Sequence, residues 1–163
     1  GYLPLAVTLT QESIYEAFDG EFNQFNWFVH SHSYSANPLA CAVANESLAM
    51  LTAPGFFDEL HKKSEAMAEA AEVLKNLPWC GEFRQTGMIG ALELVEDRDS
   101  LKPFPFEKRV GFQIYQEALK RGLFLRPLGN VVYFIPPYVI NEEEIRSMMN
   151  RTAESIHAVL GEG

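Results

Sequence analysis

A polar segment, His30–Ser35, runs directly into a strong helix start at Asn37 and Pro38. Asparagine is a preferred N-cap, and proline is tolerated at the first helical position because its missing N–H would be unpaired there anyway. Serine and histidine beside the positive end of a helix offer O–H and N–H donors that suit a phosphate group. An ordinary polar loop that merely caps the helix has the same pattern. A metal site at His30 and His32 is disfavoured, because no third ligand has a convincing position nearby.

A second candidate for chemistry is Arg126, which ends the apolar segment Leu123–Arg126 and is followed by Pro127. A guanidinium at the end of a strand can project two N–H donors into a cleft and hold a carboxylate. A charge-assisted bond of this kind contributes on the order of 1.5–3 kcal/mol. The alternative is an arginine whose stem covers apolar surface while its head stays in water. The aromatic and proline-rich segment Tyr133–Tyr138 fits either a pocket wall or core followed by a rigid turn.

Hydrophobic spacing and capping signals predict helices and strands that alternate along the chain. The predicted helices cover residues 10–18, 37–51, 56–77 and 107–121, and a last helix begins after Asn141. The predicted strands cover residues 3–9, 88–95, 123–126 and 131–135. The last two strands lie too close together for a crossover helix between them. We therefore expect an α/β or α+β layered fold with a mixed or antiparallel sheet covered by helices.

Composition limits the partners and the compartment. The 163 residues, 47% of them hydrophobic, are enough for one domain, or for a small domain plus part of another. A net charge of −9, from 13 basic and 22 acidic residues, disfavours binding to nucleic acid or to an anionic membrane surface. Cys41 and Cys80 form neither a CxxC motif nor a disulfide framework, which favours a reducing compartment. Without a basic leader or a membrane-length apolar run, we expect a cytoplasmic protein.

Three segments taken together, Gly1–Ala6, His30–Ala42 and Gly122–Ile140, closely resemble the C-terminal half of the class III, fold-type I pyridoxal-phosphate aminotransferases. The resemblance covers essentially the whole chain. It implies the C-terminal part of that fold, a homodimer whose active sites are shared between subunits, small-molecule substrates and pyridoxal 5'-phosphate as cofactor. Arg126–Gly129 and Pro136–Tyr138 are most similar to the members that transfer an amino group from S-adenosylmethionine to 8-amino-7-oxononanoate in biotin biosynthesis.

The resemblance also implies roles for single residues. His30–Ser33 corresponds to the family's His-Gly-x-Thr segment, which binds the cofactor phosphate and reaches into the active site of the partner subunit. The main chain of His32 and the Ser33 hydroxyl are therefore expected at the phosphate, and Ser31 on the substrate side. Arg126 corresponds to the arginine that holds the carboxylate of the keto substrate. Serine at position 33 replaces the usual threonine, and Ser31 and Ala36 stand where glycine is common.

In this family the Schiff-base lysine lies a few residues before a Gly-Gly pair whose second member resembles Gly1. The chain's lysines all lie elsewhere, at Lys62, Lys63, Lys75, Lys102, Lys108 and Lys120. We therefore expect the catalytic lysine upstream of Gly1 and no turnover by this chain alone. Residues 1–52 would be a remnant of the large cofactor-binding domain with the interdomain helix, and residues 53–163 the C-terminal small domain. Two rival interpretations stay open: a class III aminotransferase for an ω-amino acid, and a non-catalytic dimerisation or ligand-binding module.

Overall fold

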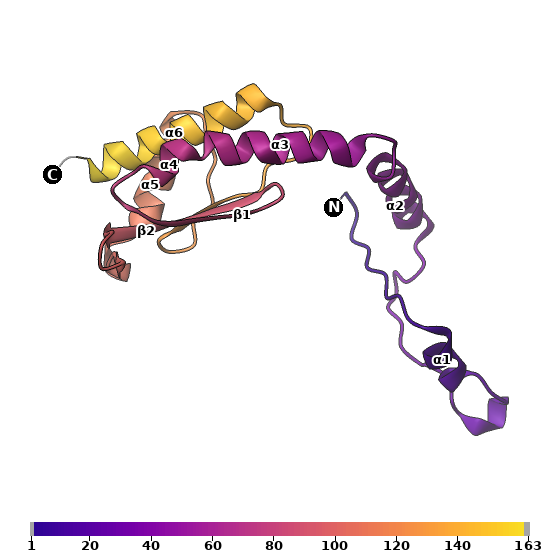
Figure 1. The fold of residues 1–163 in the computed structure, drawn as a ribbon. Helices are drawn as coiled ribbons and strands as arrows, with labels where there is room; N and C mark the ends of the chain where they lie inside the picture. The colour runs from indigo at the N-terminus through magenta and orange to yellow at the C-terminus, as the bar shows by residue number, and fades with distance from the viewer. Residues whose placement is uncertain (1, 162–163) are drawn as a thin grey trace. The chain divides into compact units, whose positions relative to one another are not determined.

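A computed structural model describes residues 2–161 of the chain (Figure 1). Backbone contacts divide the chain into two compact units, residues 1–56 and residues 57–163.

The first unit contains short helical turns and one long helix. Helix α1 (Glu12–Tyr15) continues as a 3-10 turn, Glu16–Phe18, and a second 3-10 turn covers Phe22–Gln24. Helix α2 (Pro38–Leu51) has the predicted bounds, with Asn37 as its N-cap. The strand predicted for residues 3–9 is wrong, because no described part of this unit is a strand with which it could pair.

The side chains of the first unit are almost entirely exposed. Among its described residues, only Ala40 is buried. Its aromatic rings contact one another instead of a core: Phe22 stacks on Trp27 with 5.7 Å between ring centroids, and Phe18 meets Phe28 edge-on at 5.2 Å. Phe22 nevertheless stays 79% exposed. These ring contacts enclose no core.

The second unit is built around an antiparallel sheet of four strands. These are β1 (Cys80–Thr86), β2 (Ile89–Asp97), β3 (Lys102–Pro103) and β4 (Val131–Phe134), and each of the other three pairs antiparallel with β2. The antiparallel sheet confirms the expected fold class, although β1 was not predicted. The strand predicted for residues 123–126 is wrong: the segment has no ladder partner, and regular pairing begins only at Val131.

Helices α3 (Phe56–Ala70), α4 (Glu72–Lys75), α5 (Val110–Lys120) and α6 (Glu142–Leu160) pack with this sheet. Figure 1 shows α3, α4 and α6 over one side of β1 and β2. The single helix predicted for residues 56–77 is interrupted at Ala71, which separates α3 from α4. A 3-10 turn, Phe106–Lys108, precedes α5.

The last helix shows how the sequence specifies this packing. Asn141 Oδ1 accepts a hydrogen bond from the Glu144 N–H at 2.9 Å, and Glu144 Oε2 accepts one from the Asn141 N–H at 2.9 Å. This capping box satisfies two donors that the helix end would otherwise leave unpaired. From there, α6 buries side chains at helical spacing: Ile145, Met149, Thr152 and Ile156, all with 0% exposure.

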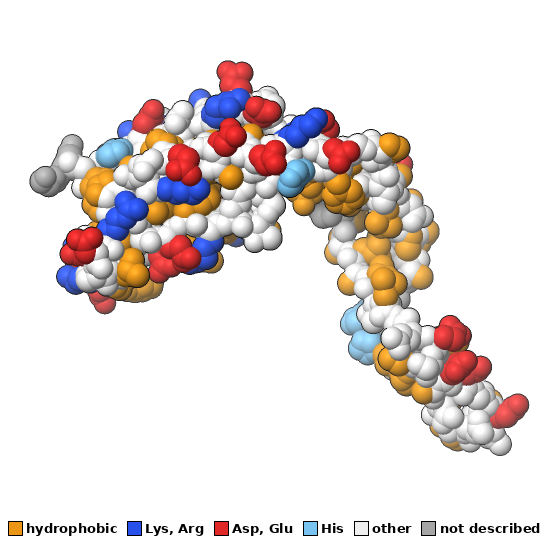
Figure 2. Space-filling view, in the orientation of Figure 1, with side chains coloured by type: hydrophobic (Ala, Val, Ile, Leu, Met, Phe, Trp, Pro, Cys, Tyr) orange, Lys and Arg blue, Asp and Glu red, His pale blue; other side chains and the backbone are white. Residues whose placement is uncertain are grey.

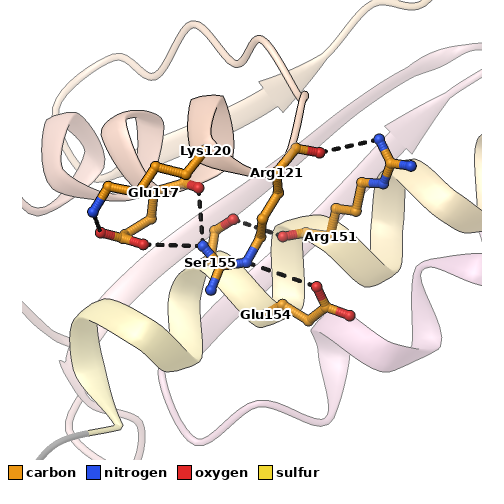
Figure 3. A network of polar contacts seen from close by, with 6 residues as sticks. All are labelled: Glu117, Lys120, Arg121, Arg151, Glu154 and Ser155. Carbon is orange, nitrogen blue, oxygen red and sulfur yellow. Dashed lines mark hydrogen bonds and ion pairs between the residues drawn. The ribbon is translucent and has the colours of Figure 1, made fainter.

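Polar contacts join the end of α5 to α6 (Figure 3). Arg121 Nη1 donates to Glu117 Oε2 at 3.0 Å, and its main-chain oxygen accepts a hydrogen bond from Arg151 Nη1 at 3.1 Å. Ion pairing with Lys120 and then with Arg121 lowers the pKa of the Glu117 carboxyl. These contacts fix the point from which the chain leaves α5 toward Arg126.

Candidate functional site

The first candidate site is the turn that precedes α2. The Ser35 N–H donates to the His32 carbonyl oxygen at 2.9 Å, and the His32 N–H donates to Ser35 Oγ at 2.9 Å. The Asn37 N–H donates to the Tyr34 carbonyl oxygen at 3.2 Å. Ala36 has a φ of 55°, in the left-handed region that glycine occupies more easily. The chain thus closes a compact turn immediately before the helix.

Ser33 keeps its hydrogen-bonding groups available within this turn. Among the described residues, its hydroxyl and its main-chain N–H have no hydrogen-bond partner, and the side chain is exposed. The first-turn N–H groups of α2 are occupied, since Asn37 Oδ1 accepts from Leu39 N at 3.0 Å and from Ala40 N at 3.5 Å. Ser33 and exposed Ser31 are therefore among the free donors next to the helix start.

The charge around this turn differs from that of an arginine-based phosphate site. Residues 1–56 contain no Lys or Arg, and that part of Figure 2 shows the pale blue of His but not the darker blue of Lys and Arg. A phosphate here would be held by neutral O–H and N–H donors near a helix start, an arrangement that suits an anion. The residues present therefore fit the phosphate of pyridoxal phosphate. They do not fit its aldehyde end, because no lysine lies in this unit.

Arg126 lines a cavity of about 400 Å³ in the second unit. The cavity lies between the Phe106–Lys108 turn, helix α5 and residues 124–130. Volumes of this order are typical of small-molecule sites. None of the residues that line it is an aspartate or glutamate. The interpretation of Arg126 as a residue that faces a cleft therefore has a cavity to support it, although the segment before it is not a strand.

Arg109 also lines this cavity, although its place beside Lys108 in the sequence gives no signal of such a role. It is the N-cap of α5, with a left-handed φ of 47°, and its guanidinium carbon lies 4.3 Å from the centroid of the Phe112 ring. Tyr115 meets Phe124 edge-on at 5.7 Å, so aromatic rings form much of the wall. The site is thus apolar along its walls and cationic at two positions.

A tight turn positions the chain after Arg126. The Leu128 N–H donates to the Val131 carbonyl oxygen at 2.8 Å, and the Val131 N–H donates back to Leu128 at 2.9 Å. Gly129, with a φ of 58°, lies inside this turn, and Asn130 Nδ2 donates to the Phe104 carbonyl oxygen at 2.8 Å. These bonds fix the turn to the Phe104 segment and to the start of β4.

The segment Tyr133–Pro137 lines a second, larger cavity of about 650 Å³, which supports the pocket-wall interpretation of that segment. Phe134 and Pro136 are buried, whereas Tyr133 is half-buried. Arg126 is not among the residues that line this second cavity. The predicted site residues therefore fall into two groups: Ser31, His32 and Ser33 in the first unit, and Arg126 in the second.

Two classes of site receive no support from the described residues. Within residues 2–161, no three His, Cys, Asp or Glu side chains lie together in a group that could hold a metal ion. None of the helices in the same range is both long enough and apolar enough to cross a membrane.

Solved structures define the fold class. Adenosylmethionine-8-amino-7-oxononanoate aminotransferase from Methanocaldococcus jannaschii matches 98% of this chain with a TM-score of 0.93 and 32% identity, and the match covers 36% of that chain. A PLP-bound aminotransferase mutant from Vibrio fluvialis matches 86% of this chain with a TM-score of 0.80 and 26% identity, covering 31% of its own length. The fold is that of the fold-type I, pyridoxal-phosphate-dependent aminotransferases.

Sequence comparison places the chain within that class. Residues 1–156 match the family described as Aminotransferase class-III, and the chain belongs to this family. The adenosylmethionine-8-amino-7-oxononanoate aminotransferase of Geobacter sulfurreducens is 43% identical over 161 residues, which are 99% of this chain and 36% of the relative. The enzyme of the same name from Anoxybacillus flavithermus is 36% identical over 96% of this chain and 34% of its own length. The chain spans about a third of the length of these relatives.

Proposed function

We propose that this chain is the C-terminal portion of an aminotransferase of biotin biosynthesis. The complete enzyme transfers an amino group from S-adenosylmethionine to 8-amino-7-oxononanoate, which gives 7,8-diaminononanoate. The observation that carries the proposal is Arg126 at an acid-free, aromatic cavity, in a chain whose relatives bear the name of this enzyme. An apolar chain that ends in a carboxylate, as in 8-amino-7-oxononanoate, matches such a cavity in shape and charge.

Different residues of this chain bind different parts of the cofactor and the substrate. Ser33 and the main chain of His32 hold the cofactor phosphate, Ser31 lies on the substrate side, and Arg126 holds the carboxylate of the keto substrate. Because the His32 N–H already donates to Ser35 Oγ, we assign the direct N–H and O–H contacts mainly to Ser33. The cofactor, when bound, supplies the electron sink for amino transfer, and these residues supply anchoring and orientation.

The lysine that anchors the cofactor lies outside this chain in our proposal. Every lysine here belongs to the second unit and contacts an oxygen there, such as Lys63 Nζ with the Tyr138 carbonyl oxygen at 2.7 Å. We expect the reading frame to continue upstream through a Lys-x-Leu-x-Gly-Gly-like segment. We also expect no product from the isolated chain with pyridoxal phosphate and both substrates; turnover by the isolated chain would contradict this part of the proposal.

The complete enzyme is proposed to be a cytoplasmic homodimer in which the turn at Ser33 contributes to the active site of the partner subunit. The exposed rings of the first unit, among them Phe22 and Trp27, support this proposal, since burying them against a second copy is favourable. Its partners are otherwise small molecules. Neither nucleic acid nor membrane binding is proposed, in keeping with the net charge of −9.

A donor assay tests the proposed function. The enzyme that carries this chain is supplied with 8-amino-7-oxononanoate and either S-adenosylmethionine or an ω-amino acid such as β-alanine, and the diamine product is measured. We expect product with S-adenosylmethionine. Transfer only from the ω-amino acid would favour the second candidate, which is supported by an ω-transaminase mutant from Pseudomonas jessenii, similar to this chain at 26% identity and a TM-score of 0.78. No transfer from any donor would favour a non-catalytic module.

A further inference from the structure

Most Lys and Arg side chains of the second unit are paired with an oxygen atom, but two are not. Of the 13 Lys and Arg residues, all but two donate to a carboxylate or carbonyl oxygen within the described residues. The two exceptions are Arg109 and Arg126, whose guanidinium groups have no oxygen partner in residues 2–161. Both line the same cavity of about 400 Å³. In a chain with 22 acidic residues, the two cations without an oxygen partner in residues 2–161 thus lie at one cavity.

Arg109 is exposed, and a contact with an aromatic ring holds its guanidinium at the cavity. Its guanidinium lies over the face of Phe112, at 4.3 Å from the ring centroid, which is an attractive cation–π geometry. The neighbouring Lys108 is paired with a carboxylate outside the cavity lining: Lys108 Nζ donates to Glu96 Oε1 at 2.7 Å. The cation–π contact leaves the N–H donors at the edge of the guanidinium plane available for an anion.

Close backbone packing brings the two arginine-bearing segments together. A Cβ atom on Gly111 would lie 2.2 Å from the Gly129 carbonyl oxygen and 2.9 Å from Pro127 Cβ. Only glycine therefore lets the first turn of α5, which follows Arg109, approach the turn that follows Arg126. The cavity between them is a consequence of this packing, and it contains no acidic group that would neutralise either arginine.

From these observations we propose that Arg109 is a second carboxylate-binding residue beside Arg126. The cavity then binds a ligand with an apolar chain that lies along the aromatic rings and ends in a carboxylate between or beside the two guanidinium groups. For the identity of the physiological ligand this inference rests on the proposed function. The preference of the cavity for an anionic head group, in contrast, can be measured without any amino transfer.

Binding of octanoate to the 163-residue chain tests the inference, with octanamide as the uncharged ligand of the same length. Isothermal titration should show octanoate binding at least about tenfold more tightly than octanamide, as expected for charge-assisted bonds. Arg109→Gln should weaken octanoate binding several-fold and leave octanamide binding unchanged. The control is Arg146→Gln, which removes an equal charge from an exposed guanidinium 2.9 Å from Glu142; it should change neither affinity.

A conservative variant tests whether a loss of octanoate affinity comes from the missing charge or from a folding defect. Arg109→Lys retains the cation, so it should recover most of the octanoate affinity lost in Arg109→Gln, and the circular dichroism of both variants should match that of the parent chain. If Arg109→Gln is misfolded, Arg109→Met takes its place, since it keeps an apolar stem beside Phe112 and removes only the charge; it should show the same loss of octanoate affinity.

Two results would overturn the inference. One is equal affinity for octanoate and octanamide, and the other is full octanoate binding by a folded Arg109→Gln chain while Arg126→Gln abolishes it. Neither result bears on the proposed amino transfer, which the donor assay measures separately. Conversely, a failed donor assay with intact octanoate binding would leave the two-arginine site in place and remove only its proposed physiological ligand.

Discussion

A Cβ atom on Gly111 would lie 2.2 Å from the carbonyl oxygen of Gly129, well inside any normal contact distance. Helix α5 and the turn after Arg126 therefore pack backbone against backbone. Gly111 is buried at this point although it is only the second residue of α5. This close approach is what places Arg109 and Arg126 around a common cavity.

Gly111→Ala should therefore destabilise the second unit. The added methyl group must displace the Gly129 carbonyl, and overpacking of this kind costs about 1–3 kcal/mol. Urea denaturation followed by circular dichroism measures the loss. The control is Gln116→Ala, an exposed change on the same helix that should alter the free energy of unfolding by less than about 0.5 kcal/mol. Equal stability of the two variants would show that the turn does not pack against α5.

Ala36→Gly should be neutral or stabilising, contrary to the usual cost of glycine. Ala36 has a φ of 55°, and a left-handed conformation costs a residue with a Cβ atom roughly 1–2 kcal/mol. Removing the Cβ relieves that strain, which offsets the entropy that glycine adds to the unfolded chain. Ala42→Gly, at an exposed position inside α2, is the matched control and should cost about 1 kcal/mol of helix stability. A similar loss in both variants would contradict a strained turn.

Asn37→Ala should loosen the start of α2. Its side-chain oxygen accepts hydrogen bonds from the Leu39 and Ala40 N–H groups, and losing such a cap costs typically about 1 kcal/mol. Hydrogen exchange of the α2 amides should accelerate, most at Leu39 and Ala40. Asn45→Ala, an exposed change inside the same helix, should not accelerate exchange. Unchanged exchange in Asn37→Ala would mean that the cap does not stabilise the helix.

Stability between pH 2 and pH 4.5 should depend on Glu96. Hydrogen bonds from Lys102 and Lys108 lower the pKa of the Glu96 carboxyl from 4.5 to about 2. Because the folded pKa is the lower one, the ion pairs stabilise the fold above pH 4.5, and this contribution is lost as the pH falls toward 2. Glu96→Gln should therefore lower the melting temperature at pH 6 but hardly at pH 2. Exposed Glu69→Gln is the control; an equal pH dependence in both variants would exclude the Lys–Glu96 contacts.

Local signals account for the parts of the fold that could be predicted. Asn37 with Pro38, and Asn141 with Glu144, mark helix starts by side-chain chemistry that acts within three residues, and both starts are confirmed. The apolar spacing of Ile145, Met149 and Ile156 along α6 matches its buried face, because an amphipathic helix presents one stripe to the core.

Strands were harder to predict, since their hydrogen bonds join distant residues. The segment of residues 3–9 has strand-like composition but no strand to pair with in the described part of its unit. In contrast, β1 has charged side chains at Glu82 and Arg84 and only weak alternation, and it is a strand because β2 pairs along its length. Gly87, with a φ of 54° between the two strands, was the available signal for this hairpin.

The candidate site was only partly predictable, because one of its two arginines has a local sequence signal and the other has none. Arg126 was found because the apolar segment before it and Pro127 after it marked the end of an element. Arg109 lies beside Lys108 in a polar stretch and has no distinguishing local pattern. Only the folded unit places it at the cavity that Arg126 lines.

The kinetics of Arg126→Ala in the enzyme that carries this chain test the central claim most directly. Loss of the charge-assisted contact to the carboxylate should raise KM for 8-amino-7-oxononanoate by about tenfold or more. KM for S-adenosylmethionine should change by less than about twofold, since the amino donor does not depend on this contact. An equal loss for both substrates, or no loss for the keto substrate, would contradict the assignment of Arg126 to its carboxylate.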